Sequence, residues 1–314
     1  MKIVFMGTPD FAAEALDALC RAGHEILLVV TQPDRPKGRG QTLVPCAAKE
    51  TALKYGLKVF QPERIKRPEA VEELKKYPAD VYVVAAFGQI LSQEILDLPR
   101  LGCLNIHGSL LPKYRGAAPI QWAVINGDKV TGITIMQMNA GMDTGDILMQ
   151  RELPISEEDT GASLFDRMTE LGGSLIVEAL EKLEAGLLTP VKQDEDKASY
   201  ASMLKKEMGR IDWKRSASEL ACLIRGLNSW PGAYSMSGGR TYKLHMAHEA
   251  GREEAREIGR KGARPGEVVL SGGDALYVAC GEGILAITEI QPEGKKRMNA
   301  HDFSLGYHIK EFES

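Results

Sequence analysis

The chain lacks the features of a disulfide-stabilised, secreted or membrane-spanning protein. Its five cysteines are scattered over 314 residues, and none forms a Cys-x-x-Cys pair, so neither a disulfide framework nor a zinc site is predicted. The first apolar run, residues 3–6, is followed at once by Gly7-Thr8-Pro9-Asp10, which makes it too short for a signal-peptide core. No segment has the roughly 20 consecutive apolar residues of a transmembrane helix. We therefore expect a cytoplasmic protein whose cysteines are small core residues.

Two common nucleotide-binding motifs are also missing. The first apolar run leads into Gly7-Thr8-Pro9-Asp10-Phe11, which lacks the second and third glycines of the dinucleotide motif Gly-x-Gly-x-x-Gly. A nicotinamide cofactor is therefore disfavoured. The phosphate loop Gly-x-x-x-x-Gly-Lys-[Ser/Thr] does not occur either, so the sequence has no motif that indicates an ATP-dependent reaction of this kind.

Basic residues are not in excess over the whole chain, whose net charge is -4. Residues 1–190 carry 20 Lys and Arg against 25 Asp and Glu, and residues 191–314 carry 19 against 18. Any contact with a polyanion must therefore be local. The densest basic cluster is Arg35, Lys37 and Arg39, in a Pro/Gly-rich stretch that cannot be a helix or a central strand. Taken alone, this cluster is also compatible with an ordinary solvated loop.

The first half of the chain has the alternation of short apolar runs and helical patterns that is typical of an α/β sheet domain. Thr8 and Pro9 are expected to be the N-cap and the first-turn proline of the helix that follows the first run. A long amphipathic helix from about Thr160 to Gly186 should close this domain. The apolar runs predicted to be strands are residues 3–6, 26–31, 81–85, 103–107 and 133–138.

The length of the chain favours two domains, and the helical periodicity is lost in residues 187–208. We expect a catalytic domain over 1–189, a linker over 190–208 and a second domain over 209–314. Ser216 and Glu219 predict a capping box at the start of one helix. Short strand-like runs with glycine-rich turns then predict a small β-barrel; the runs are 242–246, 267–270, 275–280 and 284–290.

The strongest candidate for chemistry is Asn105-Ile106-His107, at the end of the 103–107 run. Ligands bind beyond the carboxyl ends of strands in open α/β sheets, and residues two apart on a strand share a face. An amide beside an imidazole can polarise a carbonyl and relay a proton, as acyl transfer to an amine requires. Asp143 follows the 133–138 run, so we expect it at the same sheet edge, holding the imidazole and raising its basicity. Asn-x-His alone is equally compatible with a hydrogen-bonded strand end.

Three segments, 105–112, 113–122 and 141–146, resemble the folate-dependent formyltransferase superfamily. Segments 7–11, 31–36 and 210–213 are similar to the branch that formylates methionine on initiator tRNA. The resemblance implies a Rossmann-like, mostly parallel sheet domain followed by an OB-like β-barrel that contacts tRNA. It also implies 10-formyltetrahydrofolate as the formyl donor, methionyl-initiator tRNA as the acceptor, no metal and a monomer.

Site residues implied by the resemblance fall into three groups. The catalytic trio is Asn105, His107 and Asp143. The tRNA-binding residues are Arg35, Lys37 and Arg39 in the basic loop. Three of the folate-loop side chains, those of Phe87, Ile90 and Leu91, are equally compatible with an ordinary core. The folate-binding residues are Phe87, Gly88, Gln89, Ile90, Leu91, Ser109, Leu110, Leu111, Pro112, Asn139 and Gly141.

Two other functions remain open at this point. A formyltransferase of a small amine such as an amino sugar predicts that Arg39→Ala is harmless. A noncatalytic nucleic-acid binder that stores folate predicts that Asp143→Asn is harmless. His245 and His248 have a metal-like spacing, but no third ligand accompanies them.

Overall fold

The computed structural model describes residues 1–37, 42–259 and 262–313, and for Lys37 and Thr42 it describes the backbone only. The chain divides into two compact units, each with its own main sheet. The first unit consists of residues 1–119, 130–154 and 165–201. The second consists of residues 120–129, 155–164 and 202–314.

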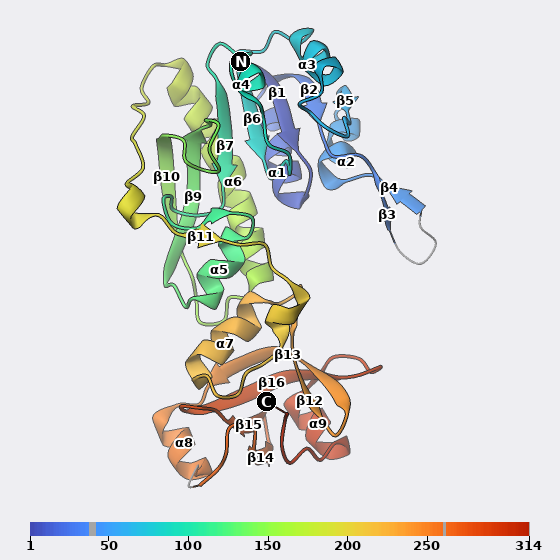
Figure 1. Ribbon diagram of the computed structural model, residues 1–314, viewed down its shortest axis with the longest axis vertical. Helices are drawn as coiled ribbons and strands as arrows, with labels where there is room; N and C mark the ends of the chain where they lie inside the picture. The colour runs from blue at the N-terminus through green and yellow to red at the C-terminus, as the bar shows by residue number, and fades with distance from the viewer. Residues whose placement is uncertain (38–41, 260–261, 314) are drawn as a thin grey trace. The chain divides into compact units, whose positions relative to one another are not determined.

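The first unit is built on a seven-stranded sheet with the order β10-β9-β7-β6-β1-β2-β5 (Figure 1). The five strands from β7 to β5 are parallel, whereas β9 runs antiparallel to β7 and to β10. The predicted fold class, a mostly parallel α/β sheet, is therefore confirmed. The strands are β1 (Lys2–Gly7), β2 (Glu25–Val30), β5 (Val59–Phe60), β6 (Val81–Ala85), β7 (Cys103–His107), β9 (Val130–Gln137) and β10 (Ile147–Pro154).

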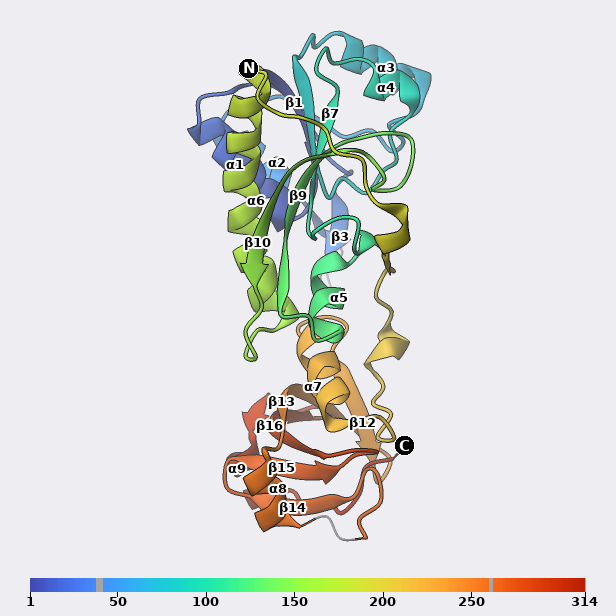
Figure 2. The same cartoon turned by 90° about the vertical axis from the view of Figure 1, so that its left-hand side faces the viewer.

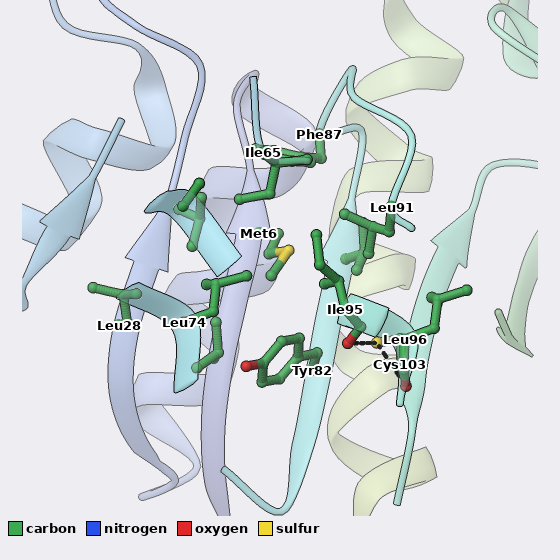
Figure 3. Close-up of a cluster of buried hydrophobic side chains, with 14 of the residues drawn as sticks. Met6, Leu28, Ile65, Leu74, Tyr82, Phe87, Leu91, Ile95, Leu96 and Cys103 are labelled. Atoms are coloured by element: carbon green, nitrogen blue, oxygen red, sulfur yellow. Dashed lines mark hydrogen bonds between the residues drawn. The ribbon is translucent and has the colours of Figure 1, made fainter. Parts of the chain in front are cut away.

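Helices cover both faces of this sheet (Figure 2). On one face α6 packs against α1, where a Cβ added to Gly172 would lie 3.3 Å from the ring of Phe11. On the other face α3 and α4 cover a buried apolar cluster that includes Met6, Tyr82 and Leu74 (Figure 3). No helix in the described part of the chain combines the length and the apolar character that a bilayer crossing demands. The helices of the first unit are α1 (Asp10–Arg21), α2 (Ala47–Lys54), α3 (Pro68–Lys75), α4 (Gln93–Leu96) and, from Phe165 on, α6 (Gly161–Glu184). Helix α5 (Pro119–Ile125) belongs to the second unit from Ile120 on.

The start of α1 differs from the sequence prediction. The helix begins at Asp10, and Pro9 occupies the N-cap position, so Thr8 is not the cap. The Thr8 hydroxyl instead donates to the carbonyl of Phe87 and accepts from the amide of Gln32. These two bonds tie together the loops that follow β1, β2 and β6, and they leave the Thr8 side chain unavailable to the first turn of α1.

Short elements complete the first unit. Strands β3 (Arg35–Lys37) and β4 (Thr42–Val44) pair as an antiparallel hairpin, and β3 contains Arg35 and Lys37 of the basic cluster. Strands β8 (Arg115–Gly116) and β11 (Tyr200–Ala201) pair in parallel, and a 3-10 helix (Glu195–Lys197) precedes β11. Part of the segment predicted as a linker is thus hydrogen-bonded to the first unit.

The second unit contains an antiparallel sheet with the order β12-β13-β16-β15-β14, and β17 pairs with β16. Residues near the C-terminus connect the two edge strands, because Glu313 bridges Met236 of β12 and Lys310 accepts from Val268 of β14. The sequence contained no usable signal for this tail. The elements are a 3-10 helix (Lys206–Gly209), α7 (Ala217–Gly226), β12 (Ala233–Ser237), β13 (Arg240–Glu249), α8 (Arg252–Ile258), β14 (Val268–Gly272), β15 (Ala275–Ala279), β16 (Ile284–Pro292), β17 (Met298–Asn299) and α9 (Ala300–Gly306).

The predicted capping box begins α7. The Ser216 hydroxyl accepts from the amide of Glu219, and the Glu219 carboxylate accepts from the amide of Ser216. We expect Ser216→Ala to lower the free energy of unfolding of the second unit by about 1 kcal/mol, because one helix N–H loses its partner. Urea unfolding monitored by tryptophan fluorescence measures this change. The exposed neighbour Ser218 provides the matched control, and an equal loss for Ser218→Ala would contradict the capping role.

Candidate active site

Strand β7 presents Asn105 and His107 on one face of the sheet. Ile106, between them, points to the opposite face, toward Gly172 of α6, where an added Cβ would lie 3.2 Å from Ile106 Cγ2. Cys103 belongs to the buried cluster under α3 and α4. Since side chains alternate along a strand, Asn105 and His107 lie on the Cys103 face, toward the carboxyl end of β7.

Cys103 itself has a structural role. Its side chain is buried in the apolar cluster, and this burial raises the pKa of the thiol to about 12. The thiol therefore stays protonated near neutral pH and is not a nucleophile. Cys280 is also buried, whereas Cys20, Cys46 and Cys222 are only half-buried, so the prediction of core cysteines holds for two of the five.

The amide of Asn105 is available to a ligand. The residue is half-buried between β6 and β9, where its backbone pairs with Val84 and Met136. Among the residues that the structure describes, none makes a hydrogen bond to its side chain. A half-buried amide without a protein partner can donate to a substrate oxygen without first losing another bond.

The imidazole of His107 is held by a backbone carbonyl. The residue is 5% exposed, and its Nε2 lies 2.9 Å from the carbonyl oxygen of Tyr114. Because a carbonyl can only accept, Nε2 carries a proton in this arrangement. Nδ1 of the neutral ring is then the nitrogen with the free lone pair. Tyr114 is a contact that sequence reasoning missed, because a backbone carbonyl leaves no signature in residue types.

Asp143 approaches the other nitrogen of the ring. Its Oδ2 lies 3.8 Å from His107 Nδ1 and accepts a 2.8 Å hydrogen bond from the amide of Gly116. The carboxylate is therefore fixed beside Nδ1 at ion-pair distance.

The path by which Asp143 reaches the ring differs from the prediction. The sequence predicts that the loop after residues 133–138 lies at the carboxyl edge of the sheet, and this prediction is wrong. Because β9 is antiparallel to β7, Gln137 pairs with Leu104, near the start of β7, while Thr134 pairs with His107. The loop therefore begins near the amino end of β7 and folds back to bring Asp143 to His107.

The predicted folate loop after β6 is only partly accessible. Phe87 and Leu91 are buried in the apolar cluster, whereas Ile90 is 71% exposed. The side chain of Gln89 is bonded to the amide of Ile65 and the carbonyl of Pro62, which holds the loop to the segment before α3. Gly88 has a φ of +79°, a conformation that favours glycine, and this gives the loop its sharp turn.

The remaining predicted folate residues lie in two loops of the same unit. Ser109 and Leu111 are buried, whereas Leu110 and Pro112 are half-buried. All four residues lie in the loop that follows His107. Ser109 donates to the carbonyl of Lys113, which closes this turn. Asn139 and Gly141 are exposed, and the Asn139 side chain accepts from the Gly141 amide and the Thr144 hydroxyl.

The base of the basic hairpin is anchored to the first unit. Lys49 contacts Asp34 at 2.6 Å and Gln61 at 2.7 Å, and Gln61 also donates to Asp34 at 2.9 Å. These bonds from Gln61 and Lys49 hold the pKa of Asp34 below its usual range, so the carboxylate stays charged. Arg35 is exposed beside this anchor. Arg39 and the side chain of Lys37 lie outside the described residues.

A cavity of about 620 Å³ lies between the hairpin and the predicted folate loop. Arg35 and Pro36 line one side, and Ala86, Phe87 and Gly88 line another. The trio of Asn105, His107 and Asp143 does not line this cavity. The cavity nevertheless places the predicted tRNA-binding hairpin and the predicted folate loop around one shared space.

Over the ranges 1–37, 42–259 and 262–313, no three His, Cys, Asp or Glu side chains are grouped in a way that would hold a metal ion. In the second unit, Nε2 of His245 is bonded to Gln291 at 3.0 Å. Nε2 of His245 is therefore engaged by the Gln291 amide and is not a free metal ligand.

Comparison with known proteins places these features in a family. The family described as formyl transferase matches residues 1–180, and the family described as formyl transferase, C-terminal domain, matches residues 203–308. A methionyl-tRNA formyltransferase of Lachnospira eligens is 49% identical over 310 residues, which cover 99% of this chain and 98% of the relative. One of Marinobacter nauticus is 49% identical over 306 residues, covering 98% and 96% of the two chains.

Solved structures show the same fold at low identity. An N-formyltransferase of Helicobacter canadensis, in complex with folinic acid and dTDP-3-aminofucose, aligns with a TM-score of 0.68 at 18% identity, over 93% of this chain and 99% of that one. HypX of Aquifex aeolicus, in complex with tetrahydrofolic acid, aligns with a TM-score of 0.62 at 20% identity, over 100% of this chain and 50% of that one.

Proposed function

The chain belongs to the formyl transferase family, and from this premise we propose that it transfers the formyl group of 10-formyltetrahydrofolate to the amino group of methionyl-initiator tRNA. The observation that carries this function is the near-full-length identity of 45% to 49% with methionyl-tRNA formyltransferases. A sugar amine as acceptor has weaker support, because the sugar enzyme is a structural neighbour at only 18% identity.

We assign the chemistry to three side chains of the first unit. The Asn105 amide donates to the formyl oxygen as negative charge develops there. Nδ1 of His107 accepts the proton that the attacking amine loses, and the adjacent Asp143 carboxylate stabilises the imidazolium. His107 then returns this proton to the folate nitrogen as its bond to the formyl carbon breaks. Atoms and protons balance without a further reactant.

The folate and the acceptor end of the tRNA are assigned to loops of the same unit. The donor contacts the loop after β6 and the segments 109–112 and 139–141. The basic hairpin contacts the tRNA through Arg35, Lys37 and Arg39. The cavity between Arg35 and Gly88 supports this assignment, because residues of the hairpin and of the loop after β6 line the same space.

We further propose that the enzyme acts as a monomer in the cytoplasm. The three assigned catalytic residues come from one chain, so a second copy is not needed to complete the site. Charged initiator tRNA is the substrate of cytoplasmic translation, which accounts for the compartment.

The function is tested by incubating the protein with 10-formyltetrahydrofolate and charged initiator tRNA. We expect N-formylmethionine to accumulate on the tRNA, with little product on charged elongator tRNA. Formylation of a sugar amine in place of methionyl-tRNA would overturn the assignment.

Arg35 provides a test of the hairpin's role. We expect Arg35→Ala to raise the KM for tRNA about tenfold, because a charge-assisted hydrogen bond to phosphate contributes ~1.5 kcal/mol. The slope of log KM against log salt concentration should also decrease by about one, the change expected when one phosphate contact is lost. Steady-state kinetics over a range of KCl concentrations measure both effects. Arg64, exposed in the same unit, is the matched control; equal effects of Arg35→Ala and Arg64→Ala would contradict a specific contact.

A further inference from the structure

Arg115 is a buried cation within reach of the proposed site. Its side chain is 1% exposed, and burial of a guanidinium is unfavourable unless its donors are satisfied. Nη1 and Nη2 donate to the two carboxylate oxygens of Glu195, each at 2.8 Å. Nε and Nη2 donate to Oε1 of Gln193, at 3.0 and 2.9 Å. The guanidinium is therefore fixed by two residues of the segment that follows β10 and α6.

Gln193 also binds the loop that contains Asp143. Because arginine can only donate, the oxygen of the Gln193 amide faces Arg115 and the NH₂ group faces away. The NH₂ group donates to the backbone carbonyls of Asp143 and Gly145, both at 2.8 Å. If the amide were reversed, its NH₂ group would face the N–H groups of Arg115 and its oxygen would face the two carbonyls. Arg115 therefore sets the orientation of the Gln193 side chain.

The Asp143 backbone needs such support. Its φ is +54°, a left-handed conformation that is unfavourable for a residue with a side chain. Gln193 binds its carbonyl oxygen, and the amide of Gly116, the residue after Arg115, binds its carboxylate. The backbone carbonyl of Asp143 is thus held by Gln193, which is hydrogen-bonded to Arg115, and its carboxylate is held by Gly116, which follows Arg115 in the chain.

The same segment also supports the partner of His107. Ser199 accepts through its hydroxyl from the amide of Tyr114 and through its carbonyl from the amide of Arg115. The Tyr114 carbonyl in turn binds His107 Nε2. The segment 193–199 therefore holds the backbone on both sides of the site: Gln193 binds the Asp143 carbonyl, and Ser199 binds the amide of Tyr114. Neither residue contacts the His107 ring or the Asp143 carboxylate directly.

We propose that Gln193, oriented by Arg115, is a positioning residue that holds Asp143 beside His107. This inference rests on the catalytic roles proposed for His107 and Asp143. Loss of the two Gln193 donors should let the 139–146 loop move without altering the catalytic side chains themselves. A misplacement of the order of 1 Å reduces turnover about 10- to 100-fold, and we expect an effect in this range.

The test is the isosteric variant Gln193→Glu. It retains an acceptor for Arg115 but replaces the donors to Asp143 and Gly145 with a carboxylate oxygen. We expect kcat for methionyl-tRNA to fall about 10- to 100-fold, with KM for tRNA within about twofold of the parent. Hydrogen–deuterium exchange of the full chain should become faster within residues 139–146. Gln193→Met, which removes the donors without adding charge, should have the same two effects.

The matched control is Lys192→Gln, which makes the same change of charge at the neighbouring, exposed position. It should leave both kcat and the exchange of residues 139–146 at the parent values. Unchanged exchange in both Gln193 variants, or an equal loss of kcat in the Lys192 control, would overturn the proposal. The exchange measurement does not depend on the reaction catalysed, so it separates failure of this proposal from failure of the proposed function.

Discussion

Replacement of His107 by alanine should lower kcat for formyl transfer by about 10²- to 10⁴-fold, the usual contribution of a positioned acid or base. The Nε2–H of the ring is bonded to the Tyr114 carbonyl, and Nδ1 lies beside Asp143. In the proposed mechanism, Nδ1 is the group that exchanges the proton between the attacking amine and the departing nitrogen. KM for folate and tRNA should stay within about twofold, because the ring acts on the proton and not on binding.

A second His107 variant separates proton transfer from packing. Glutamine retains a donor for the Tyr114 carbonyl but cannot accept and return a proton, so His107→Gln should be about as inactive as His107→Ala. His301, exposed on α9, is the control, and His301→Ala should retain the parent kcat. Rapid-quench measurement of a single turnover gives these rates without interference from product release. Substantial transfer by His107→Gln would show that the ring is structural.

Asn105→Ala has the second large expected effect, a fall in kcat of about 10²- to 10³-fold, equivalent to roughly 2.7–4 kcal/mol. The Asn105 amide makes no hydrogen bond to the described residues, so it is free to donate to the developing oxyanion. Asn105→Asp, which is isosteric, should be at least as impaired, because a carboxylate repels negative charge on the formyl oxygen.

Binding measurements distinguish this role from a loss of substrate affinity. Isothermal titration of Asn105→Ala with a folate ligand should give a Kd within about twofold of the parent value, since the donor is stabilising in the transition state only. A weakened Kd that accounts for the whole loss of kcat/KM would assign Asn105 to folate binding instead.

The fold was predictable where local sequence determines it. Four strands of the parallel sheet (β1, β2, β6 and β7), the long helix α6 and the Ser216 capping box all have patterns that depend on neighbouring residues. The fifth parallel strand, β5, is only two residues long and was not predicted. The antiparallel direction of β9 was not predictable, because an apolar run has no direction. Thr8 illustrates a different limit: its hydroxyl has the chemistry of an N-cap, but bonds to Phe87 and Gln32, far along the chain, determine its role.

The candidate site was likewise predictable only in part. Asn105 and His107 stand out because they are two residues apart at the end of a strand, and Asp143 because it follows another strand. The supports contributed by Tyr114, Gly116 and Gln193 could not be predicted, since two act through backbone groups and the third lies 50 residues after Asp143. By sequence, Phe87 and Leu91 are equally compatible with core and with ligand contact. The structure buries both in the apolar cluster, and Phe87 also lines the cavity.

The most direct test of the account is a crystal structure of this chain with a stable analogue of 10-formyltetrahydrofolate, in which a carbon atom replaces the nitrogen that carries the formyl group. We predict that Nδ2 of Asn105 lies within about 3.2 Å of the formyl oxygen, and that His107 and Asp143 face the formyl carbon from the same face of β7. A formyl group bound out of reach of Asn105 and His107 would contradict the catalytic roles assigned to these two side chains.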